Sequence, residues 1–138
     1  MRQLMPRCLL YISLLLFVAS GRLHAQVPFP KTEGENVRYM AYIEMPRGYV
    51  SGICVLHLEG DTIHGALFNE FGITALDFSY NLVKKKMILH TVMPMMDKWY
   101  IRKVLKKDLR QLMDCLQRGE TIWTDERYHI VYQLTPLL

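Results

Sequence analysis

The chain has 138 residues, of which 51% are hydrophobic and 22% charged, and its formal net charge is +4. This length leaves room for one small domain with a single core. Three of the 17 basic residues precede residue 26, so the remainder carries 14 basic against 13 acidic residues. That near-neutral charge, without interleaved aromatic and basic residues, argues against nucleic acid as a partner.

The first 25 residues have the pattern of a cleavable signal peptide. Arg2 and Arg7 form a basic start, and residues 8–19 form an apolar run that is short for a membrane span. A small residue, Ala25, stands at the expected cleavage point. We therefore expect a periplasmic or secreted protein after cleavage near Ala25.

Residues 26–36 contain two prolines and a glycine, which predicts an irregular and loosely held lead-in. Apolar and polar side chains then alternate over residues 37–45, which predicts the first strand of a single domain at 37–138.

Residues 49–93 read as four antiparallel strands joined by tight turns. Glycine supports two-residue turns at Gly60-Asp61 and Phe71-Gly72, and a third turn is expected at residues 81–84. These turns predict that Leu58 faces Ile63 and that Leu67 faces Leu76.

Alternation along the strands sorts the side chains into two faces. The first is a core face, comprising Cys54, Leu56, Leu58, Ile63, Leu67, Leu76, Phe78, Tyr80, Met87 and Leu89. The second is mixed but rich in apolar residues, comprising Ile53, Val55, His57, His64, Ala66, Phe68, Ala75, Asp77, Ile88, His90 and Val92.

The period changes after residue 93, where Asp97 is the expected N-cap of a helix that begins near Lys98 and stops at Gly119. One side of this helix is an apolar stripe: Ile101, Val104, Leu105, Leu109, Leu112, Met113 and Leu116. The other side carries Lys103, Lys106, Lys107, Arg110 and Arg118, which we interpret as a solvated face. Asp108 falls within the stripe, and we expect it at the boundary of the buried surface.

Residues 120–124 and 127–134 predict a final hairpin with its turn at residues 125–126, which would set Trp123 opposite Tyr128. The predicted fold is thus an α+β domain in which a curved antiparallel sheet packs against one main C-terminal helix.

Two pairs of residues could carry chemistry. His57 and His64 face each other in the predicted register and could begin a zinc or copper site, but an ordinary cross-strand pair is favoured because zinc sites need three or four ligands. Cys54 and Cys115 fit either a disulfide or two buried thiols. No catalytic motif is present, so the sequence predicts a protein that is not an enzyme and has no cofactor.

A family resemblance covers roughly residues 37–118, and it is carried by residues 52–78 and by the further strand and helix that follow them. Gly52 opens a strand, Gly60-Asp61 turns it, and residues 67–72 run into Ile73-Thr74-Ala75-Leu76-Asp77-Phe78. This order resembles the LolA/LolB-type lipoprotein carriers and receptors and small lipoprotein-like proteins of Bacteroidetes. The resemblance implies an unclosed, half-barrel sheet whose apolar face receives an acyl chain. The chain departs from the receptor branch because Cys8 lacks a lipidation box.

The leading hypothesis is a non-enzymatic protein that binds the acyl chain of a lipoprotein, a lipid or another apolar group between the curved sheet and the helix. The expected cavity walls are Ile53, Val55, Ala66, Phe68, Ile88 and Val92, with Met95 and Met96 near the mouth. One alternative is a protein-interaction module whose second face is buried in a homodimer or by another protein. The other is a metal-dependent hydrolase that uses His57 and His64.

Overall fold

A computed structural model of the protein describes residues 27–137. The predicted signal peptide at residues 1–25 lies outside this range. Residues 27–137 contain seven strands and one helix, in chain order β1 (Asn36–Met45), β2 (Gly48–Glu59), β3 (Thr62–Asn69), β4 (Thr74–Asn81), β5 (Lys86–Val92), α2 (Trp99–Gln117), β6 (Ile122–Asp125) and β7 (Ile130–Pro136). Within the described range, no helix has the length and apolar character needed to cross a membrane.

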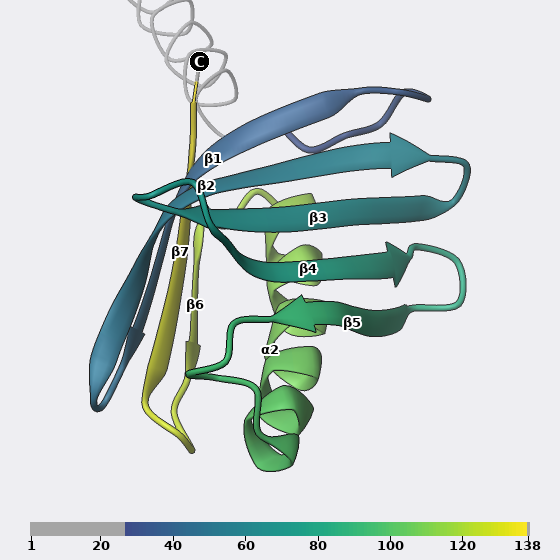
Figure 1. Cartoon of the computed structure of the whole chain (residues 1–138). Helices are drawn as coiled ribbons and strands as arrows, with labels where there is room; N and C mark the ends of the chain where they lie inside the picture. Colours follow the sequence, from purple (N-terminus) through teal and green to yellow (C-terminus); the bar gives the residue numbers. More distant parts are fainter. Residues whose placement is uncertain (1–26, 138) are drawn as a thin grey trace, which may run out of the picture.

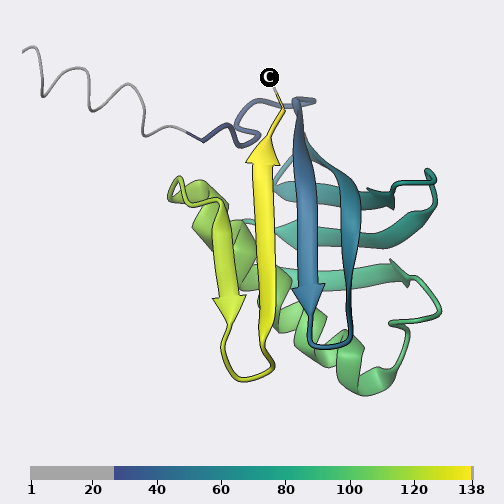
Figure 2. The ribbon, with the colours of Figure 1, turned by 90° about the vertical axis from the view of Figure 1, so that its left-hand side faces the viewer.

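All seven strands form one antiparallel sheet in the order β5-β4-β3-β2-β1-β7-β6. The sheet curls into an unclosed half-barrel, and β6 and β7 stand steeply across β3, β4 and β5 (Figure 1). The helix α2 lies in the hollow of this curl (Figure 2). The predicted α+β class and the half-barrel shape are both confirmed.

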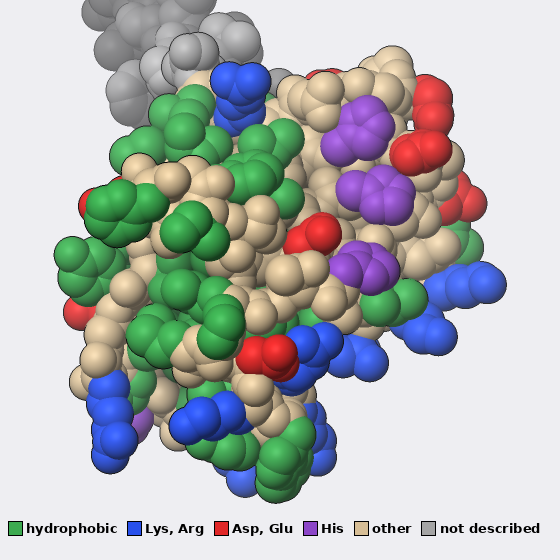
Figure 3. Space-filling model, in the orientation of Figure 1, with side chains coloured by type: hydrophobic (Ala, Val, Ile, Leu, Met, Phe, Trp, Pro, Cys, Tyr) green, Lys and Arg blue, Asp and Glu red, His purple; other side chains and the backbone are tan. Residues whose placement is uncertain are grey.

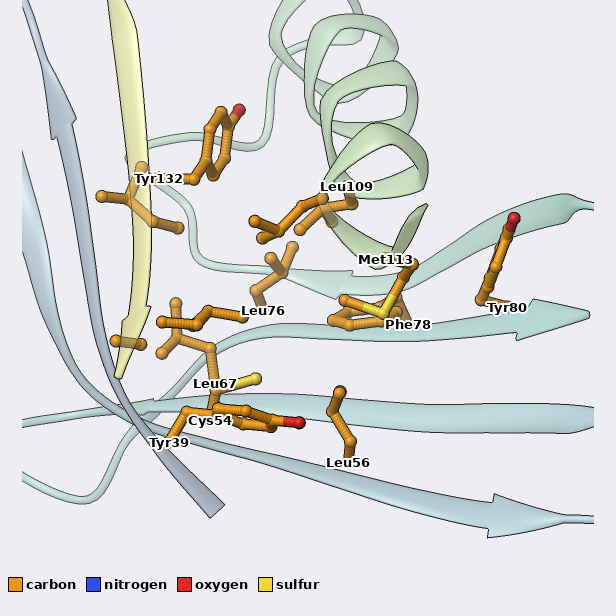
Figure 4. Close-up of a cluster of buried hydrophobic side chains, with 14 of the residues drawn as sticks. Tyr39, Cys54, Leu56, Leu67, Leu76, Phe78, Tyr80, Leu109, Met113 and Tyr132 are labelled. Atoms are coloured by element: carbon orange, nitrogen blue, oxygen red, sulfur yellow. The ribbon is translucent and has the colours of Figure 1, made fainter. Parts of the chain in front are cut away.

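The core lies between α2 and the concave face of the sheet, which is the predicted core face. Along β1, Tyr39, Ala41 and Ile43 alternate inward and are almost fully buried. The later part of the helix stripe packs onto the same surface, as Leu109 and Met113 show in Figure 4. Each buried side chain of this size contributes roughly 1.5–3 kcal/mol, so this interface is a main source of stability.

The central registers follow the prediction. Leu58 pairs with Ile63 across the Gly60-Asp61 turn, and Leu67 pairs with Leu76 across the next one. A bulge at residues 67–68 sets Phe68 opposite Thr74, so the second turn is longer than two residues.

A second bulge, at residues 77–78, shifts β5 by one residue relative to β4. As a result Val92 pairs with Leu76 and is buried in the core. Ala75 is buried as well, because it is the extra β4 residue of the first bulge, between Thr74 and Leu76. The prediction that Ala75 and Val92 lie on the second face is therefore wrong, because one extra residue in a strand reverses the side chains beyond it.

Three further expectations need correction. Lys98, not Asp97, is the N-cap of α2; it makes no side-chain capping bond, and Asp97 instead pairs with Arg102 at 2.9 Å. In the last hairpin Trp123 pairs with Tyr132 rather than Tyr128. The turn there is longer than predicted because the Asp125 side chain accepts backbone N–H groups of the turn at 3.0 and 3.1 Å.

The lead-in is irregular, as predicted, but it is firmly attached. Phe29 is buried, and the Tyr39 hydroxyl donates a hydrogen bond to the carbonyl of Pro28. The Glu33 carboxylate accepts the backbone N–H of Gly60 at 2.7 Å. The lead-in thus supports the β2–β3 hairpin.

Candidate functional site

An apolar groove opens beside the first half of α2. It has a volume of about 250 Å³ and is lined by Met45, Pro46, Tyr100, Ile101, Val104, Leu105, Tyr128 and Ile130. The residues come from three places: the β1–β2 hairpin end, the first turns of α2 and the β6–β7 hairpin end. Figure 2 shows both hairpin turns at the same end of the molecule as the start of α2.

The groove exists because the apolar stripe of α2 is longer than the surface that covers it. Leu109, Leu112 and Met113 are fully buried, whereas Ile101 and Val104 are only partly covered. The aromatic rings at the rim, Tyr100 and Tyr128, are 49% and 45% exposed. A concave, apolar surface with a few hydroxyl groups at its edge is suited to binding an apolar group.

The space directly between α2 and the sheet is closed. Only about 20 Å³ remains there, lined by core residues such as Cys54, Leu67 and Met113. That volume is about enough for one water molecule, and its walls are apolar. An acyl chain has no room in the centre of this interface.

The predicted cavity walls do not lie together. Ile53, Val55, Ala66, Phe68 and Ile88 are on the convex face, which points away from α2. Of the remaining three, Val92 and Met96 are buried in the core, and Met95 is 62% exposed. The convex face does carry an apolar row across three strands, because Met40 pairs with Ile53 and Ile53 pairs with Phe68.

His57 and His64 are a cross-strand pair on the convex face, as the register predicts. His57 Nδ1 is 2.8 Å from Asn36 Oδ1, and the Ser79 hydroxyl lies 3.2 Å from His64 Nδ1 and 2.7 Å from His90 Nε2. Histidine side chains lie in a line on this face (Figure 3). Within residues 27–137, no group of three or more ligand-type side chains is arranged to hold a metal ion.

The cysteines do not form a disulfide. Cys54 and Cys115 are both free and buried. Burial raises the pKa of the Cys54 thiol to about 12, which leaves it unreactive near neutral pH. Burial likewise raises the pKa of Cys115. Both thiols therefore act as small apolar side chains.

A buried polar contact joins α2 to the last hairpin. Asp108 is fully buried rather than at the boundary, and its Oδ2 accepts a hydrogen bond of 2.7 Å from the Tyr132 hydroxyl. Its other oxygen has no donor among the described residues, and the Asp125 carboxyl group is close enough to raise the pKa of Asp108. Two ionised carboxylates would repel each other here. If Asp108 is protonated, it can instead donate a hydrogen bond to the Asp125 carboxylate.

The pKa values of the two carboxyl groups diverge accordingly. Burial and the contact with Asp125 raise the pKa of Asp108 to about 7, although the Tyr132 hydroxyl works against this rise. Burial also acts to raise the pKa of Asp125, but the hydrogen bonds from Asp108 and two backbone N–H groups outweigh it and lower that pKa. Sequence spacing alone could not show that β6 and β7 cover Asp108.

Comparisons with protein-family models, with curated proteins and with solved structures found no match. A proposal for the function of this protein must therefore be argued from its own sequence and geometry.

Proposed function

We propose that this protein binds a single alkyl or acyl chain in the apolar groove beside the first half of α2. The observation that carries the proposal is the groove itself, a hollow of about 250 Å³ with almost wholly apolar walls. It is slightly smaller than the ~300–1,000 Å³ typical of pockets for drug-sized ligands. One flexible chain suits this volume better than a rigid polycyclic molecule.

The position of the groove also favours this occupant. It lies between the helix and the ends of two hairpins, so a chain could enter from solvent without opening the core. Tyr100 and Tyr128 at the rim present hydroxyl groups that can contact the polar end of a ligand. The resemblance of residues 52–78 to acyl-chain carriers is consistent with the same ligand class, and makes a lipoprotein acyl chain its proposed physiological form.

A chain-length series tests the proposal. Each buried methylene contributes ~0.8 kcal/mol, so affinity should rise from octanoate to dodecanoate and then level off once the groove is full. The Val104→Trp variant places an indole in the groove. It should therefore weaken the binding of a fluorescent fatty acid by roughly 10-fold or more. The measurement is fluorescence titration, with native mass spectrometry for stoichiometry.

Val83→Trp is the matched control, since Val83 is 70% exposed and does not line the groove. It should bind like the unchanged protein. Absence of binding across the series, or equal effects of the two tryptophans, would refute the proposal.

A second candidate function is self-association through the convex face. The row Met40–Ile53–Phe68 leaves Met40 54% and Ile53 42% exposed, and Figure 3 shows apolar side chains gathered over this part of the sheet. A stable dimer would have to bury roughly 800 Å² on each copy.

Light scattering at rising concentration tests this candidate. If the row is the interface, Ile53→Lys should shift a dimer to a monomer, because it would bury an unpaired charge at the centre of the contact. Ile88→Lys is the control, as Ile88 is on the same face and similarly exposed but outside the row. A monomeric unchanged protein at all concentrations would exclude this interface.

A further inference from the structure

A strongly basic groove lies on the other flank of α2. Its volume is about 500 Å³, and its lining is Lys84, Lys85, Lys86, Met87, Lys103, Lys106, Lys107 and Arg110. The cations come from the β4–β5 turn, from the first residue of β5 and from the solvent side of α2. Basic side chains gather along the right and lower edges of the space-filling view (Figure 3). The sequence pattern indicated the basic face of the helix but not the basic turn that faces it.

The turn that presents the lysines is well fixed. The Asn81 side chain accepts the backbone N–H groups of Val83 and Lys84 at 3.0 and 2.8 Å. The N–H of Leu82 is bonded to the Asp61 carbonyl at 2.8 Å. Lys85 has a φ of 54°, a backbone region in which glycine or asparagine is the usual choice. Lys85 thus places a charged side chain at a position whose backbone conformation is unfavourable for lysine.

Within residues 27–137, none of the cations in this basic groove forms an ion pair, although Lys107 is close enough to lower the pKa values of Asp108 and Asp125. Seven of the 14 basic residues after residue 26 line it, although the net charge of that part is only +1. The ion pairs found within residues 27–137 use other groups: His64, Arg102 and Arg118. Seven like charges around one concave surface repel one another and produce a focused positive potential.

The residue types indicate the kind of anion. Six of the seven cations are lysines, which act as mobile point charges with three donors each. A single carboxylate would need only one or two of them, and the planar, bidentate geometry that arginine offers is nearly absent. Several tetrahedral anionic groups held close together would engage most of the lysines at once.

We propose that the basic groove binds a ligand that carries two or more phosphate groups, either as a free oligophosphate or as a phosphorylated lipid headgroup. This site is separate from the apolar groove, because the two are lined by different residues of α2. It does not depend on the alkyl-chain proposal. Its floor is Met87, which is 2% exposed, so a bound anion would remain at the surface and exchange with solvent.

The test compares two triple variants with equal loss of charge. Lys103→Gln, Lys106→Gln and Arg110→Gln together remove three cations from the basic groove. Arg38→Gln, Arg47→Gln and Lys98→Gln together remove three exposed cations elsewhere. The probe is inorganic tripolyphosphate, titrated by calorimetry at low and high salt. Circular dichroism and thermal unfolding check that both variants are folded.

The unchanged protein should bind tripolyphosphate, and added salt should weaken the binding. The groove variant should bind roughly 10- to 100-fold more weakly, and the control variant less than about 2-fold. Equal losses in the two variants would show that only net charge matters and would overturn the proposal. Absence of tripolyphosphate binding together with absence of binding to acidic vesicles would also overturn it.

Vesicles distinguish the two sources of phosphate. Phosphatidylcholine vesicles with and without a phosphoinositide whose inositol ring carries two phosphates are sedimented with each variant. Groove-dependent binding to the acidic vesicles, displaced by tripolyphosphate, assigns the site to a lipid headgroup. Tripolyphosphate binding without vesicle binding assigns it to a free oligophosphate. A failure of either arm leaves the fatty-acid measurement on the apolar groove unaffected, since that measurement uses different variants.

Discussion

The unfolding free energy of this protein should fall as the pH rises from about 4 to about 7, and Asp108→Asn should remove that fall. Asp108 is buried between α2 and the last hairpin, and its pKa is raised to about 7 from an ordinary value of 3.8. Between these values the folded chain holds a proton that the unfolded chain has released. The protonated acid therefore stabilises the fold below about pH 4, and this stabilisation is lost as the pH passes 7.

The size of the effect follows from the same interval. A pKa difference of this width corresponds to at most about 4 kcal/mol, and relaxation around the buried carboxylate will reduce it to roughly 2–4 kcal/mol. Asparagine imitates the protonated acid, because its oxygen can accept from the Tyr132 hydroxyl and its amide can donate to Asp125. The variant should match the unchanged protein at pH 4 and exceed its stability at pH 8.

Urea unfolding of both proteins at a series of pH values measures the difference directly, and other titrating groups cancel in the comparison. Asp114→Asn, on the same helix, is the control for loss of a carboxylate and should leave the pH dependence in place. A constant difference between Asp108→Asn and the unchanged protein from pH 4 to pH 8 would contradict the assignment of the proton to Asp108.

The second large effect is expected at Gly52 in β2. A Cβ atom at this position would lie 1.7 Å from the carbonyl oxygen of Phe68 in β3. Backbone atoms cannot rotate away, so the two strands would have to separate beside the bulge at residues 67–68. Gly52→Ala should therefore cost about 3 kcal/mol or more, at the upper end for overpacking.

Gly48→Ala is the matched control, because a Cβ there meets nothing within 4 Å. It lies at the start of the same strand and should change stability by less than about 1 kcal/mol. The midpoint of urea unfolding and the yield of folded protein compare the two variants. Similar midpoints would mean that β2 and β3 approach each other less closely at Gly52 than described.

The part of the sheet that could be predicted from the sequence is the part whose register is set by a tight turn. Gly60-Asp61 fixes the β2–β3 register over its whole length, through the pair His57–His64 to the pair Gly52–Asn69. The bulges were not predictable, because an extra residue in β4 or β5 leaves no mark in a hydrophobic pattern until the partner strand is known. For that reason Val92 was placed on the wrong face.

The candidate sites depend on distant segments, and sequence patterns did not bring these together. The helix stripe was correct, yet nothing in its spacing shows that Ile101 and Val104 extend beyond their cover. Lys103 was interpreted as a solvated surface charge and no role was predicted for Lys85, and only the packing of α2 beside the β4–β5 turn makes them neighbours. Likewise Asp108 looked like an edge charge until β6 and β7 covered it.

The central place of β1 in the sheet has a consequence for how the chain folds. Tyr39 in β1 pairs with Pro136 in β7. One edge of β1 therefore has no partner strand until the C-terminal end of the chain has been synthesised. Such long-range closure slows folding, because loop entropy is lost before the contacts form. A nascent chain therefore keeps an open β1 edge until its C-terminal hairpin has been synthesised.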